Sequence, residues 1–302
     1  MERDGSLGQD VAPPLVHSAK AIGAHPQFRA AQAIYYARFD ALYGDNPFLN
    51  KLMMQGARSL VFITLLLQDA AYDEADRATW PTLASLQRAM AQLGLGSSRH
   101  VEQLIQRLIH VGFVEARASP ADRRVRLLKP AAPMIAHDLD WIAAHYAPLA
   151  YLYGAERYAL PLTRDRAFQA AQRRVAAASL EALSRPLLTN PPILFFAQHD
   201  AAFMILLALA KAALEVDAQV AVVPYAELAR RYAISRTHVR RVLDQAAERG
   251  WIVLEGGPRR AVALLSPLRA ALDRFVAESM ANHDLTLAQA MRDLATGPVG
   301  RT

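Results

Sequence analysis

Two segments of the sequence place a row of polar side chains opposite a row of apolar ones. Residues 98–111 and 237–250 carry apolar residues at helical spacing, so each segment is expected to form a helix with one buried face. Arginine, glutamine, serine and threonine occupy the other face, and these side chains hydrogen-bond to base edges and phosphates. The candidate DNA-binding residues of these helices, their first turns and the hairpins after them are Ser98, Arg99, His100, Gln103, Arg107, Arg123, Arg124, Arg126, Arg236, Thr237, His238, Arg240, Arg241, Gln245, Arg259 and Arg260.

The positive charge of the chain gathers around the same segments. The formal net charge is +6. Residues 97–126 hold six arginines and three acidic residues, and residues 229–260 hold eight arginines and three acidic residues. A solvated helix face usually mixes the two signs more evenly. The excess therefore favours an acidic partner, double-stranded DNA, at these surfaces.

Each of these helices stands inside the same order of elements. Residues 225–234 form an amphipathic pattern, Ser235 is placed to cap the next helix, and Gly250 is placed to end it. Two strand-like runs, residues 251–255 and 261–266, follow. Residues 83–93, 98–111 and a hairpin around residues 118–123 repeat this order. The sequence therefore predicts a mainly α fold with small β-hairpin wings, built from two winged helix-turn-helix units.

The two units also resemble each other residue by residue. SSRHVEQLIQRLIHVGFVEA (97–116) aligns without a gap with the segment from Ser235, so that His100 falls on His238 and Gly112 on Gly250. Upstream, residues 28–42 resemble residues 168–183. Each of these segments is followed by an Asn-Pro pair and an apolar helix, residues 59–67 or 201–210. This order predicts an internal duplication.

The duplication sets the expected domain boundaries. Residues 1–26 are expected to form a flexible N-terminal tail, and residues 285–302 a C-terminal tail. Residues 27–154 and 155–284 are each expected to hold one winged helix-turn-helix with flanking helices. The long flanking helices of the two repeats would meet at a pseudo-two-fold interface.

In element order, the chain resembles the MarR-like winged-helix transcription regulators. Asp122-Arg123 matches a frequent pair in that family's wing, whereas Pro258-Arg259 replaces it in the second repeat. The resemblance implies a repressor-type, sequence-specific DNA-binding regulator whose first helix and post-wing helices form a dimer interface. Family members are usually homodimers of chains about half this length. This chain would therefore act as a monomeric pseudo-dimer, with a higher oligomer left open, and its unlike reading helices would recognise an asymmetric operator.

The resemblance also implies a small aromatic effector, because MarR-like proteins often bind one between the dimer helices and the reading lobe. Aromatic residues cluster at Tyr35, Tyr36, Phe39 and Tyr43, with Trp141 and others after the first reading unit. The core of the interface is the alternative explanation for these residues, and it is favoured because aromatic side chains are expected there anyway.

Other chemistries lack the necessary residues. The sequence contains no cysteine, glycine-rich phosphate loop, nucleophile elbow or zinc-hydrolase motif, so we expect neither an enzyme nor a cofactor. His137 and His145 lie eight residues apart without a close histidine pair, so we expect no metal site. The first residues lack the apolar core of a signal peptide, and polar residues interrupt the apolar stretches. A cytoplasmic, nucleoid-associated protein without membrane contact is expected.

Two other functions fit the same pattern. A plasmid or phage replication initiator also carries two winged-helix domains in one chain. A winged-helix scaffold could instead bind proteins and never contact DNA.

Overall fold

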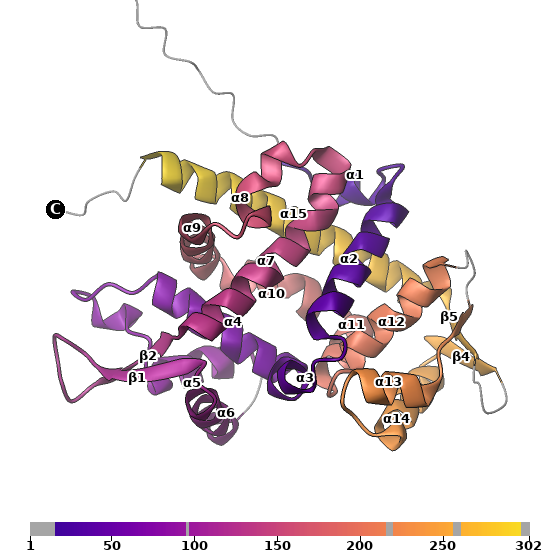
Figure 1. Cartoon of the computed structure of the whole chain (residues 1–302), viewed down its shortest axis with the longest axis horizontal. Coiled ribbons are helices and arrows are strands. Elements are labelled where there is room, and N and C mark those ends of the chain that lie inside the picture. Colours follow the sequence, from indigo (N-terminus) through magenta and orange to yellow (C-terminus); the bar gives the residue numbers. More distant parts are fainter. Residues whose placement is uncertain (1–15, 95–96, 216–219, 256–260, 297–302) are drawn as a thin grey trace, which may run out of the picture.

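The protein is mainly helical, with two small antiparallel sheets, which confirms the predicted mainly α class (Figure 1). The computed structural model describes residues 16–94, 97–215, 220–255 and 261–296. We refer to residues up to 154 as the first half and to the remainder as the second half. The first half contains α1 (Ala19–Gly23), α2 (Phe28–Tyr43), α3 (Pro47–Met53), α4 (Gly56–Ala70), η1 (Arg77–Thr79), α5 (Leu83–Gln92), α6 (Ser98–His110), β1 (Val114–Ala118), β2 (Arg126–Pro130) and α7 (Ala132–Tyr153).

The second half follows a similar order of elements. The second half begins with η2 (Glu156–Tyr158) and α8 (Ala159–Leu162). The helices α9 and α10 then take the place in the element order that the single helix α2 has in the first half. The short helix α11, which begins at a proline, and the apolar helix α12 follow, as α3 and α4 do in the first half. The elements are α9 (Arg166–Ala177), α10 (Leu180–Leu188), α11 (Pro191–Gln198), α12 (Ala202–Glu215), β3 (Val220–Val222), α13 (Tyr225–Arg231), α14 (Arg236–Glu248), β4 (Ile252–Glu255), β5 (Ala261–Leu264) and α15 (Ser266–Thr296).

The helices α6 and α14 begin and end where local sequence dictates. The hydroxyls of Ser97 and Ser235 accept hydrogen bonds from the backbone N–H groups of His100 and His238, at 3.2 and 3.0 Å. Each bond satisfies one of the unpaired donors of a helix N-terminus. Just past the helix ends, Gly112 and Gly250 adopt φ values of 75° and 72°, a conformation that glycine takes without a steric penalty.

A short strand joins the second sheet and was not expected from the sequence. β3 pairs antiparallel with β5, with Val222 opposite Ala261, and β5 pairs in turn with β4. In the first half, a single backbone hydrogen bond replaces this strand pairing. The N–H of Leu128 in β2 donates to the carbonyl of Pro81, just before α5, at 2.7 Å. Three residues are too few to show strand periodicity in a sequence.

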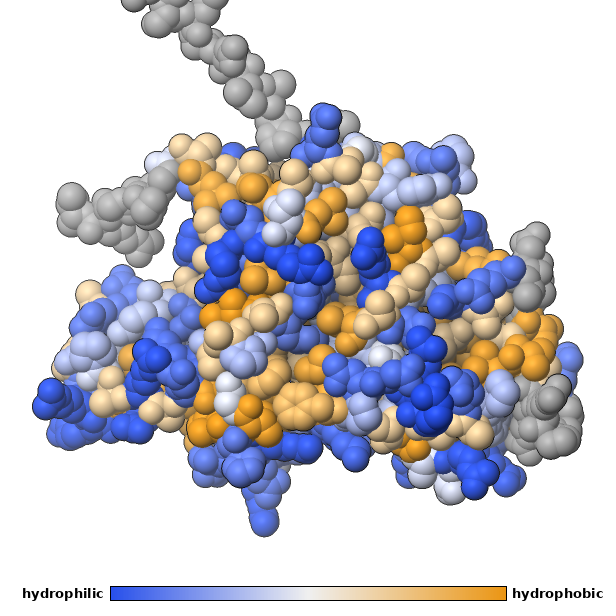
Figure 2. All heavy atoms as spheres, in the orientation of Figure 1, coloured by the Kyte–Doolittle hydropathy of each residue, from blue (hydrophilic) through white to orange (hydrophobic). Residues whose placement is uncertain are grey.

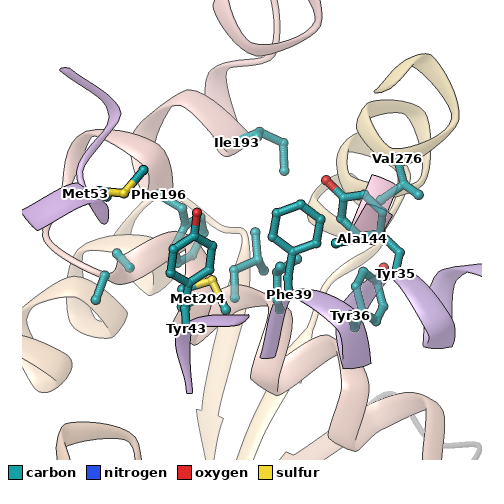
Figure 3. Packing of buried hydrophobic residues seen from close by; sticks show 14 of the residues in the cluster. Tyr35, Tyr36, Phe39, Tyr43, Met53, Ala144, Ile193, Phe196, Met204 and Val276 are labelled. Carbon is teal, nitrogen blue, oxygen red and sulfur yellow. The ribbon is translucent and has the colours of Figure 1, made fainter. Parts of the chain in front are cut away.

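The two halves share one continuous hydrophobic core. Helix α2 packs against α7 of its own half and against α12 of the second half, while α9 packs against α15 of its own half and α4 of the first. Figure 3 shows Tyr35, Phe39 and Tyr43 of α2 among Phe196 and Met204 of the second half. The halves therefore interlock through reciprocal contacts, and neither buries its apolar surface alone.

Both ends of the described chain contain more helix than we expected. Within the predicted N-terminal tail, α1 buries Ile22 completely and packs on α15. The helix α15 continues to Thr296, well into the predicted C-terminal tail. A five-residue helix has little stability of its own, so tertiary packing rather than local propensity holds α1 in place.

None of the helices in the described ranges combines the length and apolar character needed to cross a bilayer.

Candidate nucleic-acid interface

The helices α6 and α14 present their polar faces on the same side of the molecule. Both lie along the lower edge in Figure 1, with the β1–β2 and β4–β5 strand pairs at the two outer ends. The buried face of α6 consists of Val101, Leu104, Ile105 and Leu108, and that of α14 of Val239, Val242, Leu243 and Ala246. Hydrophilic residues cover the lower edge over both helices in Figure 2. The apolar periodicity therefore turns both rows of candidate residues outward.

The candidate residues of α6 are mostly exposed and unpaired. Ser98, Arg99, Gln103 and Arg107 are exposed, and His100 is half-buried. Within the described part of the chain, neither arginine forms an ion pair. Guanidinium groups in this state keep all their donors for an anion outside the protein.

The candidate residues of α14 are more engaged with the protein. Arg236, Thr237, Arg240 and Arg241 are exposed, whereas the other two, His238 and Gln245, are half-buried. Arg240 Nε lies 3.3 Å from Asp244 Oδ2 and forms an ion pair with it at the surface, where such a pair contributes little to the stability of the protein.

His238 is held inside the protein by both ring nitrogens. Its Nε2 donates to the carbonyl of Asp200 at 2.9 Å, and its Nδ1 accepts from Arg241 at 3.1 Å. The ring thus positions Arg241 and anchors the start of α14, and both of its nitrogens already have partners within the protein. Arg241 keeps further N–H groups that face solvent.

The β1–β2 strand pair of the first half, the predicted first wing, carries exposed arginines around an aspartate. Arg123, Arg124 and Arg126 are all exposed. Asp122 accepts from Arg124 at 3.2 Å and from Arg77 at 3.0 Å, and the hydrogen bond from Arg124 lowers the pKa of Asp122. Arg126 donates to the carbonyl of Ala116 at 2.8 Å, which fixes it across the hairpin. Arg259 and Arg260, the residues expected in the second wing, lie outside the described residues.

An ion-pair cluster attaches α13 of the second half to α2 of the first half. Asp40 of α2 is 7% exposed and accepts from Arg231 Nε and Nη2, at 2.9 and 2.6 Å, and from the Tyr232 hydroxyl at 2.9 Å. The backbone N–H of Asp45 donates to the carbonyl of Arg231 at 2.9 Å. No pattern in the sequence predicted this cluster, because nothing in the spacing of residues so far apart indicates that they meet.

Two further carboxylates join the halves in a reciprocal manner. Asp138 of α7 accepts from Gln169 and Arg173 of α9, and Asp273 of α15 accepts from Arg29 and Gln32 of α2. The first group is buried, whereas the second is partly exposed. In both groups, two donors about one helical turn apart on the first long helix of one half bind a carboxylate on the last helix of the other half.

The predicted effector-site aromatics of α2 lie in the core. Tyr35, Tyr36, Phe39 and Tyr43 are at most 5% exposed. His145 and His283 stack with ring centroids 4.1 Å apart where α7 meets α15. Among the residues that the structure describes, no three histidine, aspartate or glutamate side chains gather so that they could hold a metal ion.

Comparisons with protein-family models, with curated proteins and with solved structures gave no match.

Proposed function

We propose that this chain is a sequence-specific, double-stranded DNA-binding transcriptional regulator that acts as a fused dimer. One observation carries the proposal: two outward-facing, arginine-bearing helices, α6 and α14, lie along the same edge of the molecule. A dimeric helix-turn-helix protein places its two recognition helices in successive major grooves, about 34 Å apart along one face of the duplex. Two helices on one edge suit this arrangement, whereas helices on opposite faces would not.

The order of the elements supports two winged helix-turn-helix units. In each half, two helices separated by four or five residues of the sequence precede a pair of antiparallel strands and a long helix. The second helix of each pair carries the arginines, and the hairpin after it lies at an outer end, where a wing reaches the DNA backbone. This arrangement also suits the MarR-like resemblance.

Reciprocal contacts support an origin of the two halves by duplication. Helix α2 meets α12 in the way that α9 meets α4, and the two cross-half carboxylate groups mirror each other. Such reciprocal contacts are what a two-fold axis between the halves would produce.

Differences between the reading helices favour an asymmetric operator. Gln103 and Arg107 of α6 align with Arg241 and Gln245 of α14, so the two helices offer different donors to the bases. Glutamine pairs with adenine and arginine with guanine. The regulator would occupy such a site by neutralising phosphates and contacting bases, and would thereby block polymerase.

A salt titration of DNA binding tests the proposal. The full chain is titrated onto a fluorescently labelled duplex of mixed sequence, and anisotropy is measured over a range of salt concentrations. We expect Arg99→Ala and Arg236→Ala each to weaken binding by about ten-fold and to reduce the salt slope by about one. The matched control is Arg292→Ala. This exposed arginine belongs to the last turns of α15, the helix whose C-terminal end lies at the upper edge in Figure 1, and the variant should bind as the wild type does.

The scaffold alternative predicts a different result. If all three variants and the wild type show the same weak binding, the arginines of α6 and α14 do not contact DNA. The proposal would then fail, and a winged-helix unit that binds proteins would replace it.

A further inference from the structure

The turn that joins α11 to α12 is held by residues of the first half. Asp200 Oδ1 accepts a hydrogen bond from Arg58 Nη2 of α4 at 2.7 Å, and the backbone N–H of Ala201 donates to the carbonyl of Met54 at 2.6 Å. Arg58 also donates to the carbonyl of Lys51 in α3, at 2.8 Å. Ala201 adopts a φ of 52°, a conformation that residues other than glycine adopt only at an energetic cost. Contacts from the first half therefore keep this turn in place.

The same turn binds the histidine at the start of α14. The carbonyl of Asp200 accepts from His238 Nε2 at 2.9 Å, and the Nδ1 of that ring accepts from Arg241 Nη2 at 3.1 Å. A carbonyl oxygen only accepts, so Nε2 carries the ring proton and Nδ1 carries the lone pair that Arg241 needs. The position of the turn therefore selects the tautomer of the ring, and the tautomer holds the guanidinium.

These contacts form a continuous path from the first half to the outer face of α14. The path runs from Arg58 through Asp200 and His238 to Arg241. The Arg58 side chain is 19% exposed, whereas Arg241 is an exposed residue. A planar guanidinium that is held at one N–H presents its other donors in a fixed direction. That direction decides whether two of the donors can reach O6 and N7 of one guanine together.

The equivalent histidine of the first half has no such path. His100 of α6 aligns with His238, and in the described part of the chain its ring forms no hydrogen bond. Gln103 takes the place of Arg241. The carbonyl of Met54, in the turn that joins α3 to α4, accepts from the other half instead of from α6. Among the described residues, the path therefore serves α14 and has no counterpart at α6.

We propose that Arg58 and Asp200 are positioning residues for Arg241 and that they thereby set the base preference of α14. Neither residue has to touch DNA, because both act through His238. A side chain of the first half thus controls how the second half reads its half-site. The inference rests on the proposed function, since base reading by Arg241 requires that α14 lies in a major groove.

A double-mutant cycle in DNA binding tests the proposal. The duplex is the site that the wild-type full chain enriches from a randomised pool, and affinity is measured by fluorescence anisotropy. We expect Arg241→Ala to weaken binding by about ten-fold, the loss of one bidentate contact to guanine. Arg58→Ala should weaken it by about five-fold. In the Arg241→Ala chain, Arg58→Ala should cause no further loss, because the side chain through which Arg58 acts is gone.

Further variants separate positioning from a general loss of stability. Arg58→Ala and Arg99→Ala together should show the product of their separate losses, because Arg99 on α6 is not on the path. His238→Gln supplies one donor and one acceptor and should keep the wild-type affinity, whereas His238→Phe supplies neither and should bind as Arg58→Ala does. The matched control is Arg29→Ala, which removes an arginine paired with Asp273 across the halves at 3.0 Å and should bind as the wild type does. Circular dichroism and urea unfolding verify that each variant is folded.

The two kinds of failure are distinguishable. If the wild type enriches a site and Arg58→Ala weakens binding equally with and without Arg241, this inference is overturned and the proposed function stands. Wild-type affinity in His238→Phe, or a five-fold loss in Arg29→Ala, would overturn it as well. If the wild type enriches no duplex, the proposed function fails and the inference fails with it.

NMR of the imidazole nitrogens tests the path without DNA. In the DNA-free full chain, His238 should carry its proton on Nε2, and Arg58→Ala should populate both tautomers of the ring. The same single tautomer in both chains would show that Arg58 does not act on His238 and would refute the inference.

Discussion

Replacing Asp138 with asparagine should destabilise the protein by about 3–5 kcal/mol, because it leaves a buried arginine without a counter-charge. The side chains of Asp138 and Arg173 are 1% and 5% exposed, so water does not replace the lost carboxylate. Arg173 donates to Asp138 through Nε at 3.0 Å and also through its Nη2, and Gln169 adds a bond of 2.6 Å. Because the pair joins α7 of one half to α9 of the other, the loss should affect the whole chain.

The neighbouring variant Asp140→Asn provides a matched control. Asp140 lies two residues further along α7 and pairs with Arg164 at 2.5 Å, but these side chains are 44% and 56% exposed. Solvent screening limits the contribution of such a surface pair to the free energy of unfolding to about 0–1 kcal/mol. The two variants therefore remove the same charge from the same helix and differ in burial. We expect their free energies of unfolding to differ by about 2 kcal/mol or more.

Urea unfolding at neutral pH, followed by tryptophan fluorescence and circular dichroism, measures both free energies. Trp141 lies beside the buried pair, with the Arg173 guanidinium 5.1 Å from the centre of its ring, so it reports directly on this region. If Asp138→Asn and Asp140→Asn unfold at the same urea concentration, the burial of an ion pair does not determine how much it contributes to the free energy of unfolding. That result would refute the prediction.

Three further predictions concern the junction of the halves and its pH dependence. Gly44→Ala should lower the urea midpoint of unfolding, because it disturbs the contacts around Asp40. A Cβ at this position would stand 2.5 Å from the Asp40 carbonyl oxygen and 2.9 Å from Arg231 Nε. Gly23→Ala, where the nearest atom is 3.7 Å away, should leave the unfolding midpoint unchanged or slightly raised, and a midpoint equally lowered in both would contradict this account. Burial depresses the pKa of His283 to about 4, so the folded protein favours the neutral ring. The contribution of this ring to the free energy of unfolding is therefore present above pH 6.5 and is lost as the pH falls from 6.5 towards 4. The loss is about 2 kcal/mol at pH 5. His283→Gln should therefore flatten the decline of the urea midpoint over this range, and an unchanged slope would exclude His283 as its source. Asp40→Asn should lower the protection of α13 amides in hydrogen exchange more than that of α5 amides, because Arg231 on α13 loses its carboxylate partner. An equal loss of protection in both helices would show that Asp40 does not hold α13 in place.

The local sequence predicts the elements that carry the proposed interface. Apolar spacing and a serine cap define α6 and α14, and both helices begin within one residue of the position expected. These signals are local, so they need no knowledge of the fold. The outward direction of Arg99 and Arg236 follows from the same spacing.

The parts that the sequence does not reveal depend on contacts between distant residues. Arg231 binds Asp40 across 191 positions, and no local pattern marks either residue. The helix α1 is stable only because Ile22 is buried, and β3 exists only because β5 is beside it. A cavity of about 260 Å³ is lined by helices of both halves, so its position could not be derived from the sequence of either half alone.

Selection of binding sites from a pool of randomised duplexes tests the central claim most directly. The full chain and the two variants Arg99→Ala and Arg236→Ala each select sequences from the same pool. We predict that the wild type enriches one site with two unlike half-sites, centred about 10 base pairs apart, and that each variant loses preference at a different half-site. No enrichment by the wild type, or loss of the same half-site by both variants, would contradict the claim that one chain carries two distinct reading heads.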